Sequence, residues 1–154
     1  MDFWQVIDKR KSIRSFNPAK EVSDEQIKRI IQAGKRAPSA GGIYPVEFII
    51  VKEQEKKEAL ADAAGRQNFI IEAPVVIVVA VETAKTASVY GERGRKLYSI
   101  QDGAAAIENM FLAIIALGLS SCWVGAFAEK EVKTILRLSG GIRPQAILPI
   151  GYKK

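Results

Sequence analysis

The fold of this chain is decided by the stretch PVVIVVAV at residues 74–81. Seven apolar residues follow the proline, and all of them except Ala80 are β-branched. A half-buried strand would alternate apolar and polar residues, whereas an uninterrupted apolar run indicates a strand that is buried on both faces. The sequence therefore predicts a central strand with other elements packed on each side of it.

Helices and further strands are predicted around this strand in irregular order. A capping box from Ser23 to Gln26 begins a helix that ends before Pro38, and Gly118 ends the longest helix. This longest helix covers 101–117, and further helices are predicted over 53–64 and 128–138. The other predicted strands cover 46–51, 121–125 and 145–150. Because these elements follow no strict strand-helix-strand rhythm, the predicted class is α+β and not a doubly wound sheet.

Four helices have a predicted apolar side, among them the helix with Ile27, Ile30 and Ile31 and the helix over 128–138. Asp2 can cap a short helix that carries Phe3, Val6 and Ile7 on one face. In the long helix the predicted apolar residues are Ala104, Ile107, Phe111, Ile114 and Ile115. Residues 83–97 are mixed and polar with two glycines, which fits either a solvated loop or a mobile helix that covers a site.

Length and composition favour one globular domain over residues 1–154. The chain is 48% hydrophobic and 26% charged, which excludes a mainly disordered protein. Its most apolar stretch, 110–117, is far shorter than the roughly 20 residues of a membrane span. The N-terminus also lacks the layout of a signal peptide. We therefore expect no membrane partner and a cytoplasmic location.

The chain contains no histidine and a single cysteine, Cys122. This composition excludes a Ser-His-Asp triad, a histidine-ligated metal, a zinc site built from cysteines and an internal disulfide. We expect no metal and no catalytic side chain. A protein so poor in reactive groups must carry out any chemistry with a bound cofactor.

An excess of positive charge indicates an anionic partner. Lysine and arginine total 23 against 17 acidic residues, which gives a formal charge of +6. The basic residues form no run of five or more, and acidic residues are scattered among them. A small anionic ligand therefore fits better than nucleic acid, for which salt-sensitive binding would be expected.

The densest basic segment is Arg10-Lys11-Ser12-Ile13-Arg14. In an extended chain Arg10, Ser12 and Arg14 point to the same side, since side chains alternate with a period of two. Two guanidinium groups and a hydroxyl are suitable donors to a phosphate. The segment on its own is equally compatible with a solvated basic loop.

Two further segments could approach a ligand through their backbone. Small residues in Ala37-Pro38-Ser39-Ala40-Gly41-Gly42 allow a flat ring or a phosphate to come close, although a plain helix-to-strand turn is the simpler interpretation. The turn at Trp123-Val124-Gly125 could direct amide groups at a heteroaromatic ligand. The neighbouring Cys122 is interpreted as an inert core thiol, because no histidine or second cysteine can activate it.

In this order, the segments resemble the FMN-dependent nitroreductase family over about residues 3–151. The resemblance rests on the arginine-serine-arginine segment, the turn from Ala37 to Ala40, the strand that opens Ala73-Pro74-Val75-Val76, the helix that opens Asp102-Gly103-Ala104-Ala105, and Cys122-Trp123-Val124-Gly125. It implies a nitroreductase-like fold with a central, mostly antiparallel sheet flanked by helices. It also implies a homodimer with FMN bound at the subunit interface.

The resemblance assigns the cofactor-binding residues. Arg10, Lys11, Ser12 and Arg14 would bind the phosphate and ribityl end of FMN. Pro38, Ser39, Ala40 and Gly41 would line the isoalloxazine from the partner subunit. Gln67 and Asn68 would reach its pyrimidine edge, and Cys122, Trp123, Val124 and Gly125 would lie near the reactive N5 atom. The implied activity is reduction of FMN by NAD(P)H and then reduction of a nitroaromatic or quinone, by a ping-pong mechanism.

Two departures from the family pattern keep alternatives open. Many members carry an asparagine after the Pro-Ser turn, where this chain has Gly41-Gly42-Ile43-Tyr44-Pro45, a variant closer to dehydrogenases of peptide-derived azolines. Members usually continue past the equivalent of Lys154 with an arm that brings a basic residue to the phosphate. Lys153 or Lys154 would replace that residue, or the chain would be a flavin-binding module with little turnover.

Overall fold

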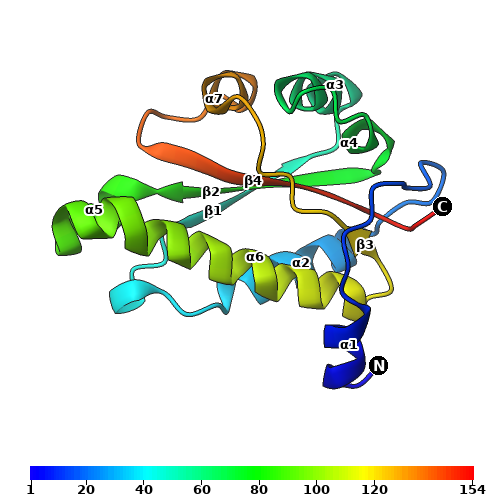
Figure 1. The fold of residues 1–154 in the computed structure, drawn as a ribbon, viewed down its shortest axis with the longest axis horizontal. Helices are drawn as coiled ribbons and strands as arrows, with labels where there is room; N and C mark the ends of the chain where they lie inside the picture. Colours follow the sequence, from blue (N-terminus) through cyan, green and yellow to red (C-terminus); the bar gives the residue numbers. More distant parts are fainter.

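The computed structural model describes residues 1–154 and contains a four-stranded antiparallel sheet between two layers of helices (Figure 1). The strands are β1 (Val46–Val51), β2 (Val75–Glu82), β3 (Ser120–Ser121) and β4 (Ile142–Gly151), arranged in the order β1-β2-β4-β3. All three neighbouring pairs are antiparallel. The α+β class and the antiparallel sheet are therefore confirmed.

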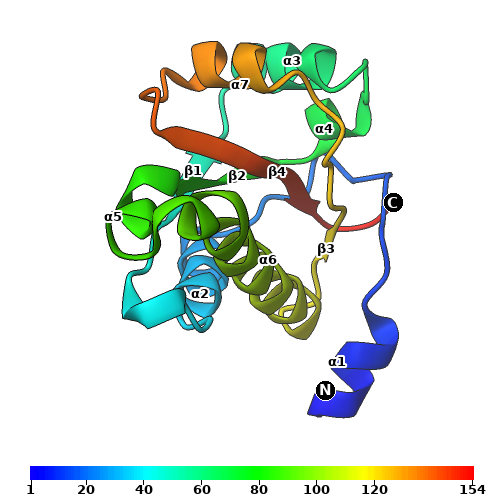
Figure 2. The same ribbon diagram turned by 60° about the vertical axis from the view of Figure 1, so that its left-hand side comes forward.

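The central strand β2 is buried on both faces, as its sequence predicts. Val75, Ile77 and Val79 pack with α2 (Asp24–Lys35) and α6 (Ser99–Ala116). On the opposite face, Val76 and Val78 pack with α3 (Gln54–Ala63), α4 (Phe69–Glu72) and α7 (Glu129–Leu136). Figure 2 shows these two helix layers on either side of the sheet.

The helix ends follow their sequence signals. Ser23 and Gln26 form the predicted capping box of α2. At the end of α6, Gly118 adopts a positive φ of 73°. This conformation lets Leu119 N donate to Ile114 O at 3.0 Å and Gly118 N donate to Ile115 O at 2.9 Å. The pair of bonds ends the helix in a Schellman motif.

The structure decides between the two alternatives left open for the residues between β2 and α6. Residues 83–97 are helical, in α5 (Thr83–Arg93) and the π-helix η2 (Gly94–Tyr98), which runs directly into α6. The long helix itself begins at Ser99, and its Ala104 is exposed although an apolar role was predicted.

Two other predictions are wrong in part. The strand predicted over 121–125 ends at Ser121, and only Val124 pairs again, in an isolated bridge with Ile147. In α1 (Phe3–Lys9) only Val6 is buried, because this helix projects from the body and leaves Phe3 and Ile7 exposed (Figures 1 and 2). No helix of the chain is both long enough and apolar enough to span a membrane.

Candidate functional site

The basic N-terminal segment lies along the free edge of β3. Ile13 N donates to Ser121 O at 2.9 Å, and Ser12 forms a parallel bridge with Ser121. Further along, Asn17 N donates to Tyr152 O at 2.8 Å. This pairing holds the segment extended, as the alternation argument requires, and joins it to the residues that precede Cys122.

The positive charges of this segment have no acidic partner. The structure contains seven ion pairs, and none of them involves Arg10, Lys11 or Arg14. Lys11, Ser12 and Arg14 are exposed, and Arg10 is partly exposed. An exposed group of uncompensated cations on a fixed strand is suited to bind an anion.

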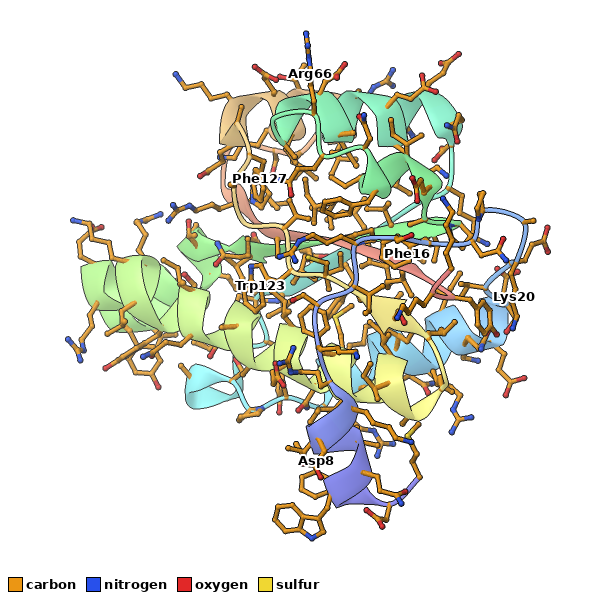
Figure 3. All side chains as sticks on the ribbon, turned by 45° about the vertical axis from the view of Figure 1, so that its right-hand side comes forward. Asp8, Phe16, Lys20, Arg66, Trp123 and Phe127 are labelled. Carbon is orange, nitrogen blue, oxygen red and sulfur yellow. The ribbon has the colours of Figure 1, made fainter.

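The loop after β3 crosses the edge of the sheet and presents free amide groups. Trp123 stacks on Phe111 of α6, with ring centroids 6.3 Å apart, whereas Phe127 packs into the cluster on the other face (Figure 3). Between them, the amides of Gly125 and Ala126 donate no hydrogen bond within the chain. These exposed N–H groups are available to a ligand. Cys122 is buried, in agreement with an inert thiol.

The start of α4 joins the same edge. Ala128 N donates to Ala63 O at 2.8 Å, which ties the loop after β3 to the end of α3, just before Gln67 and Asn68. Gln67 Nε2 donates to Ala64 O at 2.9 Å, and Asn68 is exposed. The structure therefore places three of the four predicted binding segments along one edge.

The C-terminal end of α4 is fixed by polar contacts. The Glu72 carboxylate accepts from Phe16 N at 3.3 Å and from Lys154 Nζ at 3.1 Å. The hydrogen bond from Lys154, and to a smaller extent that from Phe16, holds the pKa of Glu72 below its ordinary value. The buried ammonium of Lys57 donates to Ile71 O and Ala73 O at 3.2 and 2.9 Å, and burial lowers its pKa. These contacts hold the end of α4 that lies opposite to Gln67 and Asn68.

The fourth segment, the turn after α2, lies apart from this edge. Ser39 begins the short helix η1 (Ala40–Gly42), in which Gly41 adopts a positive φ of 60°. The Asp102 carboxylate accepts from Ser39 Oγ at 2.8 Å and from Ala40 N at 3.0 Å, and Ser39 Oγ accepts from Tyr44 N at 2.9 Å. No hydrogen bond joins the turn to the three segments at the β3 edge.

Asp102 is a residue of the candidate site to which the sequence analysis gave no binding role. It is the only buried acidic side chain in the chain, at 7% exposure. The sequence could have indicated this residue, because Asp102 lies among the alanines and other apolar residues of the long helix. A buried carboxylate at such a place requires hydrogen-bond donors nearby. Here those donors are supplied by the Ser39 turn.

Two cavities flank this turn, and both are lined by Pro38, Ser39 and Asp102. One, of about 300 Å³, lies toward α2 and β1 beside Phe48. The other, of about 530 Å³, lies toward α5 and η2 beside Tyr90 and Tyr98. The turn therefore forms a wall between the two cavities, and the hydrogen bonds to Asp102 hold this wall in place.

Comparison with known proteins identifies the family. A sequence model of the Nitroreductase family matches residues 7–68 and 62–152. The chain belongs to the nitroreductase family. The resemblance inferred from the five segments is thereby confirmed, and the chain is an oxidoreductase of this family.

Individual relatives agree with this assignment along their length. A protein of Archaeoglobus fulgidus, provisionally named an NADH dehydrogenase/NAD(P)H nitroreductase, is 31% identical over 97% of this chain and 84% of its own. A nitroreductase family protein from Clostridium novyi NT superposes with a TM-score of 0.91 at 30% identity, covering 100% of this chain and 86% of the other. An FMN-dependent nitroreductase from Clostridium difficile R20291 gives 0.83 at 28% identity, covering 97% and 86%.

Proposed function

We propose that residues 1–154 form one FMN-binding domain that is reduced by NAD(P)H and then reduces a nitroaromatic or a quinone. The observation that carries this proposal is the β3 edge, where the unpaired cations of Arg10, Lys11 and Arg14 lie on the same edge as the free amides of Gly125 and Ala126. The names of the relatives, which mention NAD(P)H and FMN, support it.

The groups at this edge fit FMN in number and kind. Arg10, Lys11, Ser12 and Arg14 would hold the phosphate and ribityl end, since guanidinium groups donate paired hydrogen bonds to phosphate oxygens. Gln67 and Asn68 would donate to the pyrimidine edge. Cys122, Trp123, Val124 and Gly125 would lie near N5, where the free amide of Gly125 can donate.

The bound flavin would supply hydride acceptance at N5 and two-electron delivery to an acceptor, so that NAD(P)H and the acceptor bind in turn. The side chains of this protein would bind and orient the reactants, and none would act as a catalytic acid or base. Amide donors toward the pyrimidine side would stabilise negative charge that develops there.

A second copy of the chain would complete the site. The turn at Pro38, Ser39, Ala40 and Gly41 lies apart from the β3 edge of its own chain. These residues would therefore line the flavin of the partner subunit. The hydrogen bonds from Ser39 and Ala40 to Asp102 would keep this wall in place before the ligand binds. We therefore propose a homodimer with FMN at the interface.

A visible absorption spectrum tests the proposal. The purified protein, with and without added FMN, would be examined anaerobically before and after NADH or NADPH is added. We expect retained flavin whose absorbance bleaches with at least one nucleotide. Bound flavin that stays oxidised with both nucleotides would contradict the oxidoreductase activity and favour a binding module.

A further inference from the structure

The segment before α6 forms a helical hairpin beside the Ser39 turn. Gly91 breaks α5 with φ 57° and ψ −145°, and the chain then turns back along the same helix. Arg95 Nη1 donates to Thr83 Oγ1 at 3.4 Å, and a Cβ on Gly94 would meet Thr86 O at 2.7 Å, so the two arms are in direct contact. Figure 1 shows this hairpin at the beginning of α6.

The hairpin places two tyrosines on one side of a cavity. The rings of Tyr90 and Tyr98 meet edge to face, with centroids 5.2 Å apart. They line the cavity of about 530 Å³, which Pro38, Ser39 and Ala40 close on another side. Tyr90 is pressed against the turn, because a Cβ on Gly41 would lie 2.6 Å from its hydroxyl oxygen. Aromatic walls of this kind favour a planar ring as occupant.

The hairpin also carries one arginine without an acidic partner beside this cavity, whose only charged lining residue is Asp102, already bound by Ser39 and Ala40. Arg95 and Lys96 both pair with Glu92, at 3.2 and 3.3 Å. Arg93 forms no ion pair; its Nε donates to Tyr98 Oη at 3.0 Å, and its guanidinium carbon lies 5.4 Å from the Tyr98 ring centroid. Since Tyr98 lines the cavity, this hydrogen bond holds Arg93 next to a lining residue. Of the three neighbouring cations, it alone lacks a carboxylate.

We propose that this cavity selects electron acceptors that combine a planar aromatic ring with an anionic group. The ring would lie against Tyr90 and Tyr98, and a carboxylate would accept from the terminal nitrogens of Arg93. The inference rests on the proposed function, because the cavity shares the Pro38–Ala40 wall with the flavin site proposed above. For 4-nitrobenzoate, the nitro group takes two electrons and two protons, from NAD(P)H and one solvent proton, and gives 4-nitrosobenzoate, NAD(P)+ and water.

Paired acceptors test this selectivity on the FMN-loaded protein. 4-Nitrobenzoate and 4-nitrobenzamide have nearly the same size and differ in charge. We expect kcat/KM to be about tenfold higher for the acid, which is the ratio expected from one charge-assisted contact. Arg93→Met should bring the ratio close to one, whereas the matched variant Arg95→Met should keep it. An equal ratio in the native protein, or equal loss in both variants, would overturn the proposal.

A binding measurement separates this inference from the proposed function. Benzoate and benzamide, which cannot be reduced, would be titrated calorimetrically into the oxidised protein and both variants. Tighter binding of benzoate that is lost only in Arg93→Met supports the cavity assignment even if NAD(P)H fails to bleach the flavin. If bleaching occurs normally but neither benzoate binding nor the acceptor ratio depends on Arg93, the cavity assignment is wrong and the proposed function stands. A loss confined to the KM for NAD(P)H would also contradict it.

Discussion

The polar donors at the β3 edge are unpaired, whereas those of the turn at Ser39 are hydrogen-bonded within the chain. At the edge, the charges of Arg10 and Arg14 and the amide of Gly125 have no partner within the chain. At the turn, Ser39 and Ala40 are both satisfied by the buried Asp102. Donors left free at a surface contribute to ligand affinity and little to folding, whereas donors paired inside contribute to stability. The two regions should therefore respond differently to mutation.

Removal of the Asp102 carboxylate should have the largest effect on stability. Asp102→Ala leaves the hydroxyl of Ser39 and the amide of Ala40 without an acceptor. We expect a loss of about 3 kcal/mol in the free energy of unfolding, because charge-assisted and partly buried hydrogen bonds are lost together. Urea unfolding of the FMN-free protein measures it.

The variant Asp102→Asn is the matched control for this prediction. Its amide oxygen can still accept one of the two hydrogen bonds, so its loss should be clearly smaller than that of Asp102→Ala. If Asp102→Ala unfolds within about 0.5 kcal/mol of the native protein, the turn does not depend on this carboxylate and the contrast between the two regions fails.

The basic edge should show the reverse behaviour. Arg10→Ala and Arg14→Ala should each weaken FMN binding by about tenfold, since each removes a charged donor to the phosphate. Their unfolding free energies without FMN should stay within about 0.5 kcal/mol of the native value, because neither guanidinium has an acidic partner to lose. Quenching of flavin fluorescence on titration measures the affinity.

Arg29→Ala provides the control, because Arg29 is an exposed cation on α2 outside the predicted site. When the titration is repeated at several salt concentrations, the FMN affinity of Arg29→Ala should equal that of the native protein at each of them. Equal weakening in Arg29→Ala and Arg14→Ala would mean that overall charge, and not the edge, attracts the ligand.

Gly41→Ala should disturb the turn by a smaller amount. Gly41 has a φ of 60°, and an added Cβ would lie 2.6 Å from the hydroxyl of Tyr90. We expect a loss of about 1 to 2 kcal/mol from backbone strain and from displacement of that tyrosine. Gly140→Ala is the control, since nothing lies within 4 Å of its added Cβ. Similar stability of both variants in thermal unfolding would show that the turn adapts freely.

Sequence patterns predicted the parts of the molecule that local rules determine. The β-branched run of β2 and the capping box of α2 are two such parts. The strand predicted over 121–125 was wrong because its pattern could not reveal that Trp123 leaves the sheet to stack on Phe111 of a different element. The segment 83–97 was ambiguous for a related reason: Gly91 and Gly94 weaken its helical pattern, yet contacts between the two arms of the hairpin keep it helical.

The candidate site was predictable to a similar extent. The basic segment is recognisable from its sequence alone, since the proposed binding of a phosphate requires only charged donors and an extended backbone. Its position beside Ser121 depends on sheet pairing between residues far apart in sequence. The partners of Asp102 were hidden in the same way, because Ser39 and Ala40 precede it by about sixty residues.

Substitution of Glu72 should have the smallest effect on stability. It also tests whether the β3 edge, unlike the Ser39 turn, keeps its shape without a carboxylate. Glu72 accepts from the amide of Phe16, two residues after the basic segment, and it is partly exposed. Its pKa in the folded protein lies below the ordinary 4.5, so its contribution to stability is present above that pH and is lost as the pH falls through the folded value. Glu72→Gln should therefore cost less than about 1 kcal/mol at pH 7, and the difference from the native protein should shrink as the pH falls below 4.5 and Glu72 becomes protonated. A larger cost, or one that does not shrink as the pH falls, would show that the edge depends on Glu72 for its shape, and that its free donors are held by more than backbone pairing with β3.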